Sequence, residues 1–95
     1  KTMARLFQAL RIAVNRELDR LESTLLSMIP ILAPHGRIVV MSYHSGEDRV
    51  VKNVFRSHGD TLTTITKKAI EASPEEVYEN PRARSARLRV TERRP

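Results

Sequence analysis

Several residue types that define common functional classes are missing or rare in this chain of 95 residues. Cysteine is absent, which excludes disulfide scaffolds, thiol nucleophiles and zinc sites built on cysteine. Aromatic residues make up 4% of the chain and tryptophan is absent, so we do not expect a domain that stacks single-stranded bases on aromatic side chains. The longest purely apolar run is residues 38–41, far short of the ~20 residues of a membrane span, and residues 1–5 lack the apolar core of a secretory signal. We therefore expect a cytoplasmic chain that does not enter a membrane.

The charge is unevenly distributed. Lysine and arginine number 17 against 11 acidic residues, a net charge of +6. Most of the excess lies in residues 82–95, which hold six arginines and one glutamate. The chain also begins at Lys1 within an apparent helix. Both features lead us to expect the C-terminal piece of a longer protein.

The first third of the chain has a helical apolar stripe. Its members recur every three or four residues: Met3, Phe7, Leu10, Val14, Leu18, Leu21, Leu25 and Met28. The stripe fits one long helix, or equally two helices that meet near Leu18-Asp19. Pro30 disfavours a straight continuation, and Pro34-His35-Gly36 ends the segment.

A strand, a helix and a second strand are predicted next. Residues 37–42 are continuously apolar and β-branched, which favours a parallel strand covered on both faces. Ser45 to Asp48 then reads as a capping box, and Gly59 as the end of that helix. Residues 61–70, rich in Thr and Ile, predict the second strand, which completes a right-handed βαβ unit.

The remaining residues predict a short helix and a final strand. Ser73-Pro74-Glu75-Glu76 is a second capping box, and Asn80-Pro81 stops the helix. Residues 86–91 alternate between apolar and basic side chains, as in a strand with one basic face. Residues 1–33 are thus helical and residues 34–95 read as βαβαβ. This is an α/β chain that resembles the C-terminal half of an open doubly wound, Rossmann-like sheet. Its three glycines form no G-x-G-x-x-G nucleotide turn.

The first candidate site is the segment that follows the strand at 37–42. In open α/β sheets, ligands bind outside the carboxyl ends of the strands. An ordinary capped turn with solvated charges explains the segment equally well. A metal site is not expected there, since no second histidine or carboxylate has ligand spacing. The candidates that could orient a ligand or hold a charge are Ser42, His44, Ser45, Glu47, Asp48 and Arg49.

Two further groups of polar residues are candidates for RNA contacts. Gln8, Arg11 and Asn15 form a polar row on the first helix, although a solvated face is the commoner explanation of such a row. The basic segment that follows Pro81 favours phosphate binding, because arginine forks suit phosphate oxygens. Lys67-Lys68 is a weaker signal of the same kind. The arginines of the basic segment are Arg82, Arg84, Arg87 and Arg89.

Five segments, in order along the chain, resemble one known family. They are Phe7–Asn15 (FQALRIAVN), Gly36–Ser45 (GRIVVMSYHS), Glu47–Lys52 (EDRVVK), Ile65–Lys68 (ITKK) and Asn80–Val90 (NPRARSARLRV). Together they resemble the S-adenosylmethionine-dependent methyltransferases that modify the exocyclic amine of a cytosine in bacterial 16S ribosomal RNA. Tyr43 and Gly46 depart from the pattern, where phenylalanine and leucine are usual.

The resemblance implies a class I methyltransferase sheet whose last strand is antiparallel, with residues 42–49 on the cytosine side of the site. It also implies that S-adenosylmethionine is bound mainly by residues upstream of this chain, with no cofactor-binding residue here. The implied activity is direct methyl transfer to N4 of a cytidine. The chain alone would be inactive, and would self-associate or sit beside the missing N-terminal half. The alternatives are a non-catalytic basic RNA-binding module, and an interaction half-domain that uses the long helix.

Overall fold

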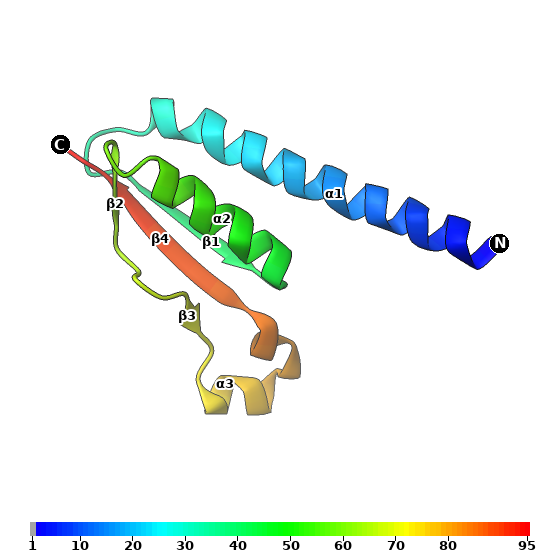
Figure 1. The fold of residues 1–95 in the computed structure, drawn as a ribbon. Helices are drawn as coiled ribbons and strands as arrows, with labels where there is room; N and C mark the ends of the chain where they lie inside the picture. The colour runs from blue at the N-terminus through cyan, green and yellow to red at the C-terminus, as the bar shows by residue number, and fades with distance from the viewer. Residues whose placement is uncertain (1) are drawn as a thin grey trace.

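The computed structural model describes the backbone of residues 2–95 and the side chains of residues 15–95 (Figure 1). It confirms an α/β chain. None of the described helices is both long and apolar enough to cross a membrane. The elements are α1 (Thr2–Met28), the 3₁₀ turn η1 (Ile29–Ile31), β1 (Arg37–Ser42), α2 (Ser45–Ser57), β2 (Leu62–Thr64), β3 (Ile70–Glu71), α3 (Pro74–Glu79), the 3₁₀ turn η2 (Pro81–Ser85) and β4 (Arg87–Arg93).

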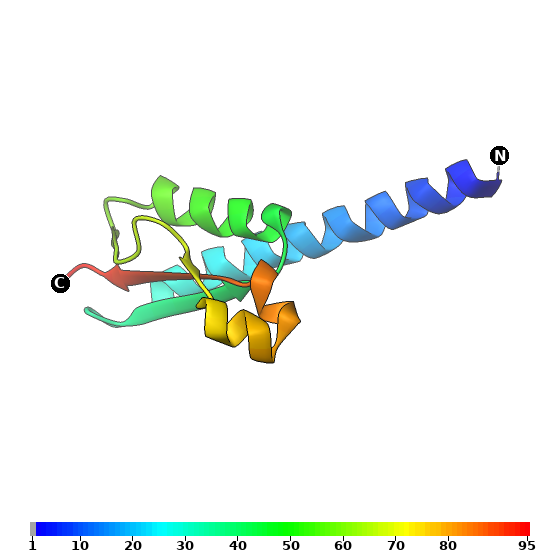
Figure 2. The same ribbon diagram turned by 90° about the horizontal axis from the view of Figure 1, so that it is seen from below.

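The apolar stripe at the start of the chain forms one continuous helix rather than two. The N-terminal half of α1 extends beyond the rest of the fold, and its C-terminal half lies beside α2 (Figures 1 and 2). Leu25 and Ile29 are buried in the core, whereas Met28 is exposed, so the last member of the buried stripe is Ile29. Pro30 lies within η1, where the α-helix has already ended, as its missing N–H requires.

The sheet is organised around β4. Its order is β1-β4-β2, and β3 also pairs with β4, in each case antiparallel. The predicted antiparallel last strand is therefore confirmed. Because β1 and β2 both run opposite to β4, they run parallel to each other, connected through α2. The predicted βαβ unit needs one correction, since β4 lies between its two strands.

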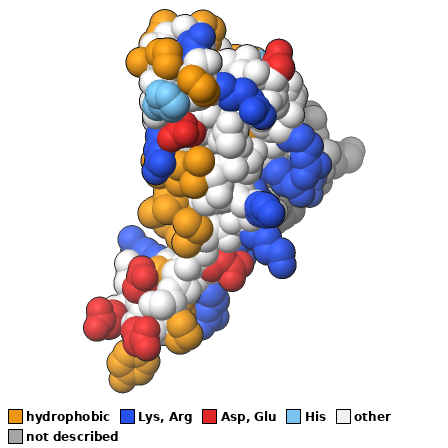
Figure 3. All heavy atoms as spheres, turned by 90° about the vertical axis from the view of Figure 1, so that its left-hand side faces the viewer, with side chains coloured by type: hydrophobic (Ala, Val, Ile, Leu, Met, Phe, Trp, Pro, Cys, Tyr) orange, Lys and Arg blue, Asp and Glu red, His pale blue; other side chains and the backbone are white. Residues whose placement is uncertain are grey.

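Only one face of this sheet is covered by the described helices. The buried core joins Ile38 and Leu62 of the strands to side chains of α1 and α2. On the other face Val39 and Met41 of β1 are 58% and 53% exposed. The expectation that residues 37–42 are covered on both faces is thus wrong for the described residues. Figure 3 shows the exposed hydrophobic side chains as a band along one flank of the molecule.

The strand predicted at residues 61–70 is broken into β2 and β3. At the break the Val90 backbone N–H donates to the Thr66 hydroxyl, with a nitrogen–oxygen distance of 3.1 Å. Ile65 and Thr66 both donate their backbone N–H groups to the Val90 carbonyl. A threonine side chain here takes the place of a backbone acceptor, which interrupts the regular ladder and turns the chain toward β3.

The helix ends differ from the predicted ones by a single residue in two places. The N-cap of α2 is His44, not Ser45, and its C-cap is His58, not Gly59. The predicted cap of α3 is confirmed, because the Ser73 hydroxyl accepts the Glu76 backbone N–H at 3.2 Å. At the predicted end of the first helical segment, the left-handed residue is His35, with a φ of 66°.

Candidate functional site

The turn between β1 and α2 is held by reciprocal capping. The Nδ1 atom of His44 accepts the Glu47 backbone N–H at 3.3 Å. The Glu47 Oε1 atom accepts the Tyr43 backbone N–H at 3.0 Å and lies 3.5 Å from His44 Nε2. This resembles a capping box with histidine in the place of serine, except that Glu47 accepts the N–H of Tyr43, the residue before the N-cap, instead of that of His44. The two side chains that the sequence marked as polar candidates therefore fix the shape of the turn.

Gly46 lies against the His44 ring and beside Leu18 of α1. A Cβ atom at this position would stand 3.2 Å from the His44 ring and 3.5 Å from Leu18 Cδ1. The first contact is tighter than most side-chain contacts, so a larger residue would displace the imidazole. The glycine that departs from the family pattern thus fits the capping role of His44.

A bidentate ion pair links the start of α2 to β4. Arg89 donates from Nε to Asp48 Oδ1 at 2.6 Å and from Nη2 to Asp48 Oδ2 at 3.0 Å. Their side chains are only 13% and 20% exposed. Hydrogen bonding from Arg89 holds the pKa of Asp48 below its usual value, although partial burial opposes the shift, and the pKa of Arg89 is raised by the same contact. The charges and hydrogen-bonding groups of Asp48 and Arg89 are therefore paired with each other.

An open groove of about 910 Å³ lies on the uncovered face of the sheet, beside the carboxyl end of β1. Its strand side is apolar, and α3 with η2 supplies polar groups. Within it Tyr43 donates its hydroxyl to the Met41 sulfur at 3.3 Å. The groove is lined by Met41, Tyr43, Ile70, Glu71, Ala72, Glu76, Asn80, Arg82, Ala83, Ser85, Ala86 and Leu88.

The arginines of the basic segment divide into two kinds. Arg82 and Arg84 lie exposed on η2, which begins where the Asn80 side chain accepts the Arg82 backbone N–H at 3.2 Å. Arg87 instead donates to the carbonyls of Arg84 and Ala86 and pairs with a β3 carboxylate. Arg82 and Arg84 have side chains directed outward, whereas Arg87 and Arg89 bind groups of the fold itself.

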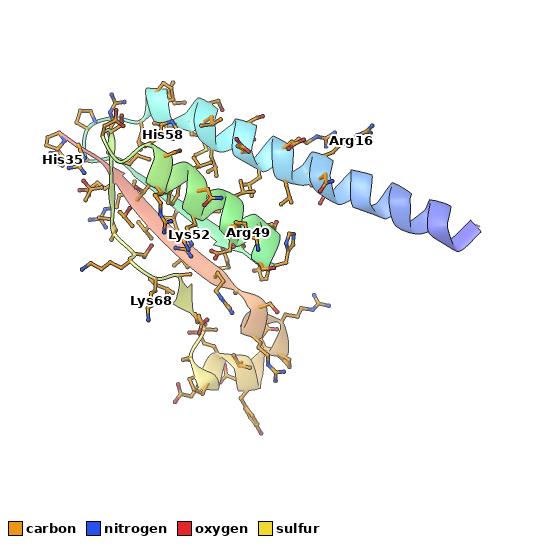
Figure 4. All side chains as sticks on the ribbon, viewed as in Figure 1. Arg16, His35, Arg49, Lys52, His58 and Lys68 are labelled. Atoms are coloured by element: carbon orange, nitrogen blue, oxygen red, sulfur yellow. The ribbon has the colours of Figure 1, made fainter. Side chains whose placement is uncertain are left out.

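The other candidates do not gather at the groove. Ser42 is 3% exposed and belongs to the covered face of the sheet, so it does not line the groove. Ser45 and Arg49 are exposed at the start of α2, where Figure 4 labels Arg49. Asn15 is exposed on α1. The side chains of Gln8 and Arg11 lie outside the described residues.

Of the residues that line the groove, the sequence predicted only Arg82 as a site residue, and those it missed include Met41, Tyr43, Asn80 and Ser85. Strand alternation is the signal that could have found the first two, because residues on either side of a buried Ser42 face the opposite side of the sheet. Asn80 and Ser85 bracket η2, so their position follows from that turn. A turn of this kind has no periodic pattern from which to place them.

Among residues 15–95, no group of three histidine or acidic side chains is placed to hold a metal ion. The β1–α2 turn carries one glycine and closes on itself through His44 and Glu47. What the arrangement offers is an apolar shelf for a planar group, with outward arginines beside it for phosphates.

Comparison with known proteins identifies relatives along the whole chain. A family model described as the MraW methylase family matches residues 1–94. The chain is 58% identical over 90 residues to a protein of Dictyoglomus turgidum named ribosomal RNA small subunit methyltransferase H, covering 95% of this chain and 30% of that protein. It is 52% identical to the protein of that name from Pseudothermotoga lettingae, with the same coverages. Against that of Chlorobium phaeobacteroides it is 48% identical, over 99% of this chain and 33% of the relative. The chain thus spans about a third of the length of these curated relatives.

Proposed function

The chain belongs to the MraW methylase family, and from that premise we propose that it forms the substrate side of an S-adenosylmethionine-dependent ribosomal RNA methyltransferase. The proposed reaction is methyl transfer to N4 of a cytidine in 16S ribosomal RNA. The observation that carries the proposal is the match over residues 1–94, together with the groove and outward arginines that this segment builds. The relatives' shared name refers to RNA of the small ribosomal subunit.

The groove suits a base that has left its stack. An enzyme that acts on a base within RNA must bring that base out, and the base must then be held by apolar and polar contacts. The side chains of Met41, Leu88 and Ile70 offer an apolar surface, and the Tyr43 ring stands at the carboxyl end of β1. Asn80 and Ser85 also line the groove and are proposed to contact the edge of the base.

Positioning is the main contribution that this segment would make to the reaction. The methyl donor, when bound, would supply a methyl group on a sulfonium; the new C–N bond would form as the C–S bond breaks, and the amine would then lose a proton. Holding the nitrogen in line with that methyl group, with water excluded, lowers the barrier without any covalent bond to the protein. Hydrogen-bond acceptors near the amine assist the attack. The nitrogen lone pair is conjugated with the ring, and accepting the N–H groups helps the nitrogen become pyramidal, which frees the lone pair. His44 and Ser45 follow Tyr43, which lines the groove, and are proposed to orient the base from the turn.

The exposed arginines of η2 are proposed to hold the RNA backbone. Arg82 lines the groove itself, and Arg84 is exposed one residue beyond Ala83. We assign phosphate binding to these two and an anchoring role to Arg87 and Arg89, whose donors are directed to groups of the chain. The methyl donor is proposed to bind in another part of the longer protein. The proposed location of the protein is the cytoplasm, where bacterial ribosomes are assembled.

A methylation assay on the natural full-length protein tests the proposal. Small ribosomal subunits lacking the modification are incubated with radiolabelled S-adenosylmethionine, and the RNA is digested to nucleosides. We expect label in N4-methylcytidine, and a large loss of label with Tyr43→Ala, which removes a wall of the groove. Tyr43→Phe keeps the ring and should retain most of the activity. RNA binding with no methyl transfer would instead support the binding-module alternative, and label in another nucleoside would refute the assigned acceptor.

A further inference from the structure

A second groove lies on the helix-covered side of the sheet, between α2 and the segment that joins β2 to β3. Its volume is about 240 Å³. Lys52 and Arg56 come from α2 and Lys67 from the β2–β3 segment, and all three are exposed. The groove is lined by Lys52, Phe55, Arg56, Gly59, Thr64, Thr66, Lys67 and Arg89.

Asp48 does not cancel the positive charge of this groove, because it is already paired with Arg89. Asp48 lies one helical turn before Lys52, close enough for the lysine charge to lower its pKa. Arg89 nevertheless occupies both oxygens of Asp48, at 2.6 and 3.0 Å. Within residues 15–95, Lys52, Arg56 and Lys67 form no ion pair with an acidic side chain. Figure 3 shows lysine and arginine side chains gathered on the flank opposite the hydrophobic band.

Ordinary surface charge does not account for this arrangement well. Arg56 lies in the last turn of α2, where a cation stabilises the helix dipole. That explanation does not extend to Lys52, which lies in the middle of the helix, or to Lys67, which comes from a different element. Three cations from two elements that line one groove are the arrangement expected of a phosphate-binding surface.

We propose that this groove binds phosphates of the RNA backbone, at a site separate from the groove on the open face. The two grooves share one border. Thr64, Thr66 and Lys67 line the second groove and residues 70–72 line the first, so a single stretch of chain along the edge of the sheet separates them. Figure 4 shows Lys68 on this edge, on the outer side of the segment. An RNA strand that crosses the edge contacts both grooves, which extends the footprint beyond the target nucleotide. The inference rests on the proposed RNA substrate.

Salt-dependent RNA binding tests the proposal in the natural full-length protein. The affinity for 16S ribosomal RNA, and for an unrelated RNA of similar length, is measured over a range of salt concentrations with Lys52→Ala, Lys67→Ala and the double variant. Each single change should lower the slope of log affinity against log salt by about 0.7–1 for either RNA, and the double variant by about twice as much. Both positions are exposed, so the fold should be retained.

The matched control is Arg16→Ala, which removes one positive charge from the exposed surface of α1, on the far side of α2 in Figure 4. It should leave the slope unchanged. Unchanged slopes for Lys52→Ala and Lys67→Ala would overturn the proposal, and so would an equal loss with Arg16→Ala, since a general charge effect would then explain the data. If the unmutated protein methylates RNA while the variants bind normally, only this site is refuted. If the unmutated protein binds no RNA, the proposed function fails with it.

Discussion

Replacing Asp48 by asparagine should destabilise the attachment of α2 to β4 far more than an ordinary change at the start of a helix. The side chain keeps its size but loses its charge, and it presents an amide group to Arg89. The two hydrogen bonds of 2.6 and 3.0 Å are then weakened together, and a guanidinium that is 13% exposed loses its counter-ion. The substitution therefore removes a paired charge from a site that water reaches poorly.

The exposure of the two side chains sets the expected size of the loss. Exposed ion pairs contribute about 0.2–1 kcal/mol, whereas removing one partner of a fully buried pair costs about 3–5 kcal/mol. Because the pair is largely but not fully buried, we expect the free energy of unfolding to fall by about 2 kcal/mol. The Arg37–Glu92 pair is the internal control. It has one hydrogen bond of 2.9 Å and an arginine that is 59% exposed, so Glu92→Gln should cost less than about 1 kcal/mol.

The pH dependence gives a second, independent readout. The pKa of Asp48 is lower in the folded protein than in the unfolded chain, where it is about 3.9. The unfolded state therefore takes up the proton first as the pH falls. The contribution of the pair is complete well above pH 4 and is lost as the pH falls through the folded pKa of Asp48. The difference between the natural protein and Asp48→Asn should accordingly shrink in acid.

Equilibrium urea unfolding of the natural full-length protein and of both variants measures these quantities, at pH 7 and over a series down to pH 3. A loss with Asp48→Asn no larger than that with Glu92→Gln would refute the reasoning. A difference that persists undiminished at pH 3 would also refute it, because the ion pair would then not be its source.

Three further predictions address the turn, the basic segment and the loop before β1. His44→Ala should lower methylation turnover with little change in RNA affinity. His44→Asn keeps a good N-cap, so it separates loss of the imidazole from loss of the cap. If asparagine restores turnover, His44 acts only by capping the helix. Arg82→Ala and Arg84→Ala should each reduce the salt slope of RNA binding by about 0.7–1 for any RNA sequence, and a loss confined to one sequence would contradict phosphate binding. Gly36→Ala should lower the free energy of unfolding in urea by at least about 1 kcal/mol, because its Cβ would stand 2.8 Å from the Ala33 carbonyl oxygen. His35→Gly should leave the protein as stable or stabilise it by up to about 1 kcal/mol, because glycine adopts the positive φ of this position without strain.

Local signals in the sequence were sufficient to place most elements. The spacing of apolar residues located α1, and the β-branched run located β1 at residues 37–42 without error. Proline and capping residues located the start and end of α3. These features depend on neighbouring residues alone, which is why they can be read from the chain. The one-residue error at His44 arose because serine is the more usual N-cap, although an imidazole nitrogen can also accept the backbone N–H.

The order of the strands in the sheet, and which face of each strand the helices cover, could not be predicted from local sequence. Alternation in residues 86–91 predicted two faces for β4 but not which one the helices cover. In the structure Arg89 and Thr91 pair across from Val40 and Ile38, on the covered face, while Leu88 lies opposite the exposed Met41. The apolar face of β4 is thus the open one. Arg89 can lie beneath α2 because Asp48 supplies its counter-charge, a contact between residues far apart in the sequence.

Whether a candidate side chain is already bonded within the fold tells more about its role than its residue type does. His44, Asp48 and Arg89 are all polar, yet each is already engaged within the chain: His44 accepts the Glu47 backbone N–H, and Asp48 accepts from Arg89. A donor already bound to a carboxylate must give up that contact before it can hold a phosphate, and in a partly buried pair the loss is costly. The outward cations, with Arg82 on one side of the sheet edge and Lys52 on the other, carry no such cost. The anchored residues therefore set the shape of the turn, and RNA affinity should respond to the outward ones.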